Sequence, residues 1–157
     1  MNLSVFAWLV DTPLSAWVNS SAYIWPTLES IHFLSLCVLM GSLLVIDLRL
    51  IGFYRTPCPS TVRFLIRLSL MAFAVNLVTG LLFFAGNTPK YIDNPAFELK
   101  LALIAAAGIN AVFYRVRLSR LVDTEDVSWA SIGVGTLSLL LWAGVIVCGR
   151  MITFYAM

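Results

Sequence analysis

Four long apolar runs constrain the fold of this chain more than any other feature. They lie at about residues 27–52, 61–85, 95–118 and 128–154, and each reaches the roughly 20 residues that a helix needs to cross a bilayer core. Charged residues make up only 11% of the chain, against about 25% in ordinary soluble domains. No connection between the runs is long enough for a soluble domain. We therefore predict one all-α membrane domain over residues 1–157, a polytopic four-transmembrane-helix bundle whose partner is the lipid bilayer.

The first 24 residues differ from these runs. They lack the basic n-region of a signal peptide, because no Lys or Arg precedes Arg49. The sequence Asp11-Thr12-Pro13 is typical of a helix start. Aromatic residues that favour the membrane–water boundary are frequent here: Trp8, Trp17, Tyr23 and Trp25. We predict an N-terminal interfacial amphipathic helix within residues 1–24, acting either as a plain anchor or as a lid over His32.

Basic residues are distributed unevenly between the two ends of the predicted bundle. At the end where the first helix finishes lie Arg49, Arg55, Arg63, Arg67, Arg115, Arg117 and Arg120. At the other end lie Lys90, Lys100 and Arg150. The positive-inside rule places the more basic end in the cytoplasm. We therefore expect a multi-pass protein of the bacterial inner (plasma) membrane with both termini periplasmic, and no nucleic-acid partner, because no such motif is present.

The first apolar run carries three ionisable side chains. At 100° per residue, Glu29, His32 and Asp47 share one stripe of the helix, with the two carboxylates about 27 Å apart. Charge inside a bilayer is costly, so this stripe should face protein. Asp47 is either a relay residue or a charged helix end at the inner interface.

Depth along the helices predicts a layer of polar groups near the outer boundary. His32, Lys100 and Arg150 each lie about five residues from the outer end of a predicted helix, which is about 7–8 Å. With Glu29 one turn from His32, these four side chains are expected to form one outer layer.

Several kinds of site fit such a layer. Our working prediction is a haem b site for redox or electron transfer, with His32 as axial ligand and Lys100 and Arg150 pairing the propionates. The expected porphyrin walls are Phe33, Phe83, Phe97 and Trp142. Glu29 would orient a neighbour. The chain has a single histidine, so it cannot supply two histidine ligands.

Three alternatives remain open. A copper site would combine His32 with soft ligands, which would be drawn from Cys37, Met40, Cys148 and Met151. A proton or ion transport relay would use Glu29 and His32 on the outer side and Asp47 on the inner side. A structural subunit with a salt-bridge network would bind nothing. Whether the protein is an enzyme stays open; catalytic motifs such as GxSxG, HExxH and Walker loops are absent from the sequence, and a redox-active chain would be an electron-transfer protein.

Small and polar faces on the second and fourth runs predict close helix packing. On the second run this face is Ser69, Ala72, Phe73, Asn76, Thr79 and Gly80, and on the fourth Ser131, Gly135, Ser138, Trp142 and Gly149. We expect Asn76 to form a helix–helix hydrogen bond. Faces of this kind also suggest a homo-oligomer.

The chain resembles a bacterial family of small four-helix inner-membrane proteins of unknown function. The matching stretches are Trp25-Pro26-x-x-Glu29-x-x-His32, Asp47-Leu48-Arg49-Leu50-x-Gly52, Asn94-Pro95-Ala96-Phe97-x-x-Lys100 and Gly149-Arg150. Its architecture is also similar to copper-resistance D proteins and cytochrome b561-like bundles, which implies a His-ligated cofactor between helices and a redox partner or quinone. Similar proteins often have a histidine where this chain has Tyr114, so the resemblance implies a single, outer-side site.

Overall fold

The structure is a computed structural model that describes residues 7–53, 58–118 and 128–154. Within these ranges all regular structure is helical, and four long helices form the body of the molecule: α3 (Ile24–Ile51), α4 (Pro59–Gly86), α6 (Pro95–Phe113) and α7 (Trp129–Met151). The shorter elements are η1 (Ala7–Leu9), α2 (Pro13–Val18), α5 (Thr88–Ile92) and the short π-helix η2 (Tyr114–Leu118). The four long helices are long and apolar enough to cross a membrane. The protein is a multi-pass, all-α four-helix bundle, as predicted.

Side-chain caps mark the starts of α2, α6 and α7. The side chain of Thr12 accepts from the Ser15 amide at the start of α2, and Asn94 accepts from the Ala96 amide at the start of α6. At α7, Ser128 and Ser131 form a reciprocal capping box. These three starts were predicted, and the observed helix bounds differ by a few residues, chiefly at the end of α6, where the chain passes into η2. Two of the predicted cytoplasmic arginines, Arg55 and Arg120, lie outside the described residues.

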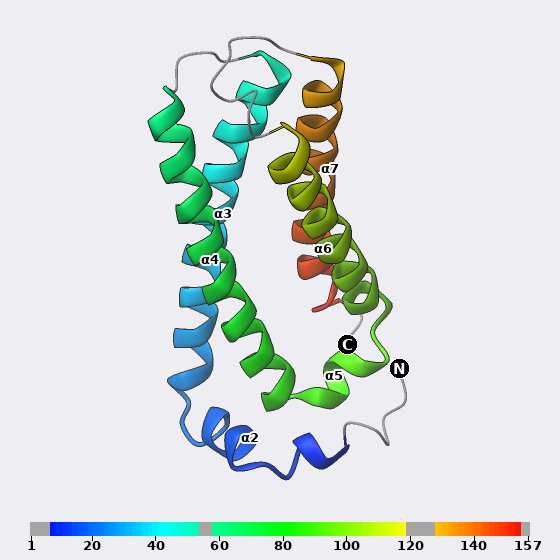
Figure 1. Ribbon diagram of the computed structural model, residues 1–157. Helices are drawn as coiled ribbons and strands as arrows, with labels where there is room; N and C mark the ends of the chain where they lie inside the picture. Colours follow the sequence, from blue (N-terminus) through cyan, green and yellow to red (C-terminus); the bar gives the residue numbers. More distant parts are fainter. Residues whose placement is uncertain (1–6, 54–57, 119–127, 155–157) are drawn as a thin grey trace.

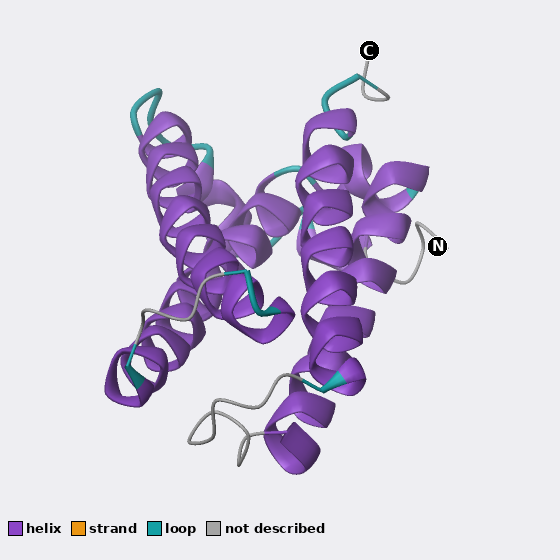
Figure 2. Ribbon diagram, turned by 90° about the horizontal axis from the view of Figure 1, so that it is seen from above, coloured by secondary structure: helices purple, strands orange, loops and turns teal. Residues whose placement is uncertain are grey.

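The helices form a ring with one weak side. Figures 1 and 2 show α3 beside α4 and α6 beside α7, and α3 also packs on α7, whereas α4 and α6 make no extensive contact. The outer end of the bundle is the one where α3 begins and α7 finishes. There α2 packs on α4, with the Asn19 side-chain amide donating to the Gly86 carbonyl at 2.9 Å. A Cβ on Gly86 would lie only 2.7 Å from Val18, so this approach requires glycine.

Polar side chains are buried between the helices together with apolar ones such as Leu39 and Ile46, while many large apolar side chains face outward. Among the buried polar residues of the long helices are Ser42, Asp47, Ser69, Asn76, Thr79, Asn110, Ser131 and Ser138. Large apolar residues such as Phe64, Ile109 and Leu140 are at least 60% exposed, as expected of a surface that contacts lipid. The Asn76 amide donates to Ser35 Oγ at 2.8 Å, which confirms the predicted helix–helix hydrogen bond. Polar and small residues therefore hold this bundle together.

Candidate functional site

His32 is half-buried in the outer part of α3, and a threonine of α4 fixes its ring. Its Nδ1 lies 2.6 Å from Thr79 Oγ1. The Thr79 hydroxyl donates its own proton to the Val75 carbonyl at 2.8 Å, so its oxygen accepts from His32 Nδ1–H. The neutral tautomer assigned by this network keeps its lone pair on Nε2. The described residues offer no hydrogen-bond partner to Nε2.

Aromatic and small side chains surround this imidazole. The Phe83 ring lies edge-on to His32 with centroids 5.5 Å apart, and Trp25 lies 5.2 Å from Phe83. The imidazole also lies over Gly80, where a Cβ would be 4.0 Å from His32 Cε1. The ring therefore occupies an aromatic, narrow site between α3 and α4.

Lys100 of α6 reaches the same layer. It is half-buried, and its Nζ lies 3.6 Å from the position that a Cβ on Gly149 would occupy. Its ammonium acts electrostatically on the His32 ring and interacts in the same way with Cys148 of α7. Lys100 thus lies beside Gly149 in the outer half of the bundle, within electrostatic range of His32.

Glu29 and Arg150, predicted for the same layer, lie at the outer surface instead. Glu29 is exposed and accepts from Trp25 Nε1 at 2.9 Å. Burial and then the nearby Glu29 carboxylate raise the pKa of Tyr91 in α5 to about 12, so Glu29 faces the outer loop. Arg150 is exposed, with its guanidinium carbon 5.9 Å from the Phe154 ring centroid.

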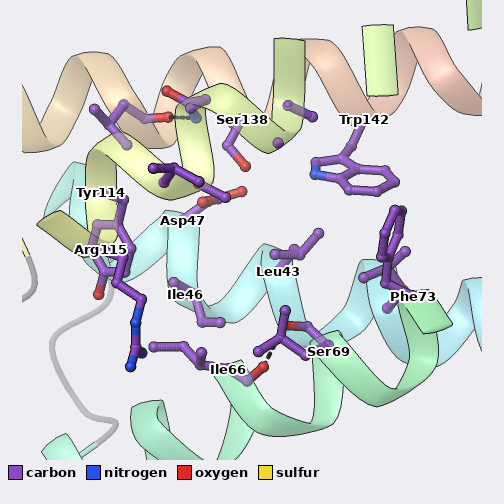
Figure 3. A pocket seen from close by; sticks show the side chains of 18 of the residues that line it. Leu43, Ile46, Asp47, Ile66, Ser69, Phe73, Tyr114, Arg115, Ser138 and Trp142 are labelled. Atoms are coloured by element: carbon purple, nitrogen blue, oxygen red, sulfur yellow. Dashed lines mark hydrogen bonds between the residues drawn. The ribbon is translucent and has the colours of Figure 1, made fainter. Parts of the chain in front are cut away.

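The four aromatic side chains predicted to wall the porphyrin lie in different parts of the structure. Phe83 contacts His32, and Phe97 stacks on Phe84 with centroids 5.6 Å apart. Phe33 is 64% exposed on the outside of α3. Trp142 lies deeper, against Phe73 at 6.2 Å in an edge-to-face arrangement, and lines a pocket in the inner half of the bundle (Figure 3).

The potential soft metal ligands are dispersed. Cys37 and Met151 are exposed, Met40 is half-buried, and Cys148 is buried on α7 near Lys100. Across the described ranges, no group of three or more His, Cys, Asp or Glu side chains gathers in a way that could hold a metal ion.

Asp47 is buried within the bundle, although one interpretation of the sequence placed it at a charged helix end. It is 3% exposed, lies beside Ser138 of α7, and has no hydrogen-bond partner on Oδ2. Gly135 permits this contact between α3 and α7, because a Cβ there would lie 2.9 Å from the Asp47 carbonyl oxygen. Its carboxyl group lines the same pocket as Trp142.

Sequence reasoning missed the roles of Thr79 and of this pocket. Thr79 was recognised only as part of a packing face, yet it bonds His32 in the same α3–α4 register that pairs Ser35 with Asn76. Aligning the polar residues of the two antiparallel helices would have exposed both pairs. The pocket depends on how four helices meet, which no local pattern encodes.

Comparisons with known proteins locate the chain in one family. Searches of curated proteins and of solved structures found no match. A family model described as "Family of unknown function (DUF6644)" matches residues 6–155, nearly the whole chain, in agreement with the predicted resemblance to a family of unknown function. The chain therefore belongs to this family, DUF6644.

Proposed function

We propose that this membrane protein binds a haem b in its outer half, with His32 as axial ligand and Lys100 beside a propionate. The observation that carries the proposal is the hydrogen bond between His32 and Thr79. A ligating histidine usually donates its other ring N–H to an acceptor, which fixes the tautomer and the ring orientation. Thr79 provides such an acceptor, because its hydroxyl is itself held on the Val75 carbonyl.

The charge of Lys100 favours haem over copper. An ammonium that acts electrostatically on His32 repels a bare metal cation but attracts the carboxylates of an anionic cofactor. The copper alternative also requires additional ligands, and the soft side chains of the described residues do not gather around His32.

The arrangement of these residues fits the group in part. His32 offers Nε2, Phe83 offers an aromatic wall, and Lys100 offers a cation. Glu29, Arg150 and Trp142 instead contact Trp25, Phe154 and Phe73, respectively. A haem held here would exchange single electrons between its ferric and ferrous states. The chain contributes the ligand, its orientation through Thr79, and a low-dielectric site between helices.

The orientation of the protein belongs to the same proposal. With the basic inner end in the cytoplasm, His32 lies on the periplasmic side of a bacterial inner membrane, as do both termini. A homo-oligomer and a redox partner or quinone are further parts of this proposal. The similarity to copper-resistance D and cytochrome b561-like bundles stays a prediction.

An absorption spectrum tests the proposal directly. The protein, produced with haem supplied and purified in detergent, should show a sharp visible band that shifts on dithionite reduction, with about one iron per chain. His32→Gly should lose iron and absorption, and added imidazole should restore the band, because the external base takes the place of the side chain.

A pair of threonine variants separates ligand orientation from general stability. Thr79→Val should weaken haem retention by about tenfold or more and shift the reduced band. Thr136→Val, an exposed threonine of α7, should leave both unchanged. A colourless, iron-free wild-type protein, prepared with haem supplied, would contradict the proposal.

A further inference from the structure

A pocket of about 340 Å³ lies in the inner half of the bundle, away from His32. All four long helices contribute to it, and its walls are mostly apolar. Its volume lies in the range of small-molecule sites, roughly 300–1,000 Å³. Figure 3 shows Asp47 near one end and the Trp142–Phe73 pair toward the other.

One acidic group distinguishes this pocket from a packing defect. Asp47 is 3% exposed and lies beside Ser138, and its Oδ2 has no hydrogen-bond partner. Arg115 also lines the pocket but is exposed, and its side chain runs away from Asp47 toward Ile66 (Figure 3). A buried carboxylate is stabilised when a cation with complementary geometry neutralises it.

The pocket opens laterally between α4 and α6, the two neighbouring helices with little contact. Several residues of α4 and α6 that line the pocket are exposed: Leu70, Gly108, Ala111 and Val112. These two helices make no extensive contact with each other (Figure 1). Since this surface faces the bilayer, a molecule entering between the helices must be soluble in lipid.

Aromatic rings complete the chemical character of the pocket. The Trp142 and Phe73 rings meet edge-to-face at 81°, and both line the cavity. Aromatic faces attract organic cations in sites that exclude water. Acid, aromatic pair and apolar walls together select a molecule that is both positively charged and apolar.

We propose that the inner pocket binds a lipophilic organic cation, whose positive centre pairs with Asp47 and whose apolar body lies between α4 and α6. The site is separate from the proposed haem site and does not depend on it. One side chain supplies the charge selectivity, and the walls supply the preference for apolar molecules.

Two probes of the same shape and opposite charge test this proposal. Purified protein in detergent should bind radiolabelled tetraphenylphosphonium saturably, with one site per chain, and tetraphenylborate should not compete. Asp47→Asn should weaken binding by at least about tenfold. Asp93→Asn, which removes an exposed carboxylate beyond α5, should bind like the wild type.

A second pair of variants serves where Asp47→Asn fails to fold. A side chain on Gly108 would enter open space, and Gly108 lines the pocket. Gly108→Leu should therefore block binding without a clash. Gly133→Leu also meets open space on α7, and binding should persist. Equal affinity for both probes, or unchanged binding in Asp47→Asn and Gly108→Leu, would overturn the proposal in favour of an unselective lipid groove.

Discussion

The outer and inner halves of the bundle each bury one side-chain oxygen without a hydrogen bond, an amide oxygen of Asn76 in the outer half and a carboxyl oxygen of Asp47 in the inner half. In the outer half, His32 pairs with Thr79 and the Asn76 amide donates to Ser35, while the side-chain oxygen of Asn76 has no hydrogen-bond partner. In the inner half, Asp47 has Ser138 beside it but leaves one carboxyl oxygen without a hydrogen bond. An unsatisfied carboxyl group is more costly than an unsatisfied amide oxygen, because it can carry a charge. The comparison suggests an orienting hydrogen bond outside and a ligand-directed acid inside.

An apolar layer separates the two halves. The register of the two outer pairs places Leu39 opposite Ala72, and both are buried. From Ser35 to Ser42, about 10 Å along α3, this layer interrupts the polar groups. A relay from His32 to Asp47 would have to cross it, so the structure favours two independent sites over one continuous path.

Truncating Leu39, a side chain of this apolar layer, should have the largest effect on stability. Leu39 is 2% exposed, so Leu39→Ala leaves a cavity and should cost about 2–5 kcal/mol of unfolding free energy. Leu44→Ala, at a leucine of the same helix that is 46% exposed, should cost much less. Thermal unfolding in one detergent compares the two variants. Equal losses would mean that Leu39 does not form a packed layer.

Crowding the α3–α7 contact should have the next largest effect. A Cβ at Gly135 would meet the Asp47 carbonyl oxygen at 2.9 Å and Leu50 at 3.1 Å, so Gly135→Val should destabilise the protein by about 1–3 kcal/mol. Gly133→Val, two residues away in open space, is the matched control. A harmless Gly135→Val would show that the inner half is loosely packed and that Asp47 is not held by α7.

Several features of the fold could be predicted from the sequence alone. Composition and hydropathy predicted the four helices, because a bilayer requires long apolar segments whatever their neighbours are. Caps at Thr12, Asn94 and Ser128 were predictable because a cap depends only on adjacent residues. The small polar faces of α4 and α7 were predictable because residues of that kind in lipid pack against protein.

The sites were less predictable because they depend on how the helices rotate and diverge. Counting residues from the helix ends placed Lys100 at the depth of His32. The same count could not show that Arg150 turns outward to Phe154. The same arithmetic did not show that Trp142 faces the inner pocket rather than His32. The helices are apolar nearly all round, so periodicity gives their lipid-facing sides weakly. The gap between α4 and α6 arises from tertiary packing alone.

The outer hydrogen bonds should be individually weak. Ser35→Ala removes the acceptor of the Asn76 amide, but that amide also donates to the Ala72 carbonyl at 3.1 Å. We expect a loss of about 0.6 kcal/mol, the average for such bonds in a membrane protein. Ser30→Ala on α3, whose hydroxyl bonds the Pro26 carbonyl of its own helix, should change stability still less. A loss of several kcal/mol for Ser35→Ala would make the outer pairs a cooperative network.

Labelling of Cys58 can show which half of the bundle faces the cytoplasm. It is exposed at the start of α4, at the inner end, and hydrogen bonds from Ser60 and Thr61 lower the pKa of its thiol to about 6. With Cys37 and Cys148 replaced by alanine, alkylation by a membrane-impermeant maleimide should reach half its maximal rate near pH 6. The rate should fall below that pH, because the thiolate is the nucleophile.

The same reagent then gives the orientation. It should label Cys58 in inside-out vesicles and spare it in intact cells, which puts the Asp47 pocket on the cytoplasmic side and His32 on the periplasmic side. Ser60→Ala with Thr61→Ala should move the midpoint toward the ordinary thiol value of about 8.5, which separates accessibility from reactivity. Labelling of Cys58 in intact cells would show the opposite topology. The proposed haem site would then face the cytoplasm and exchange electrons there.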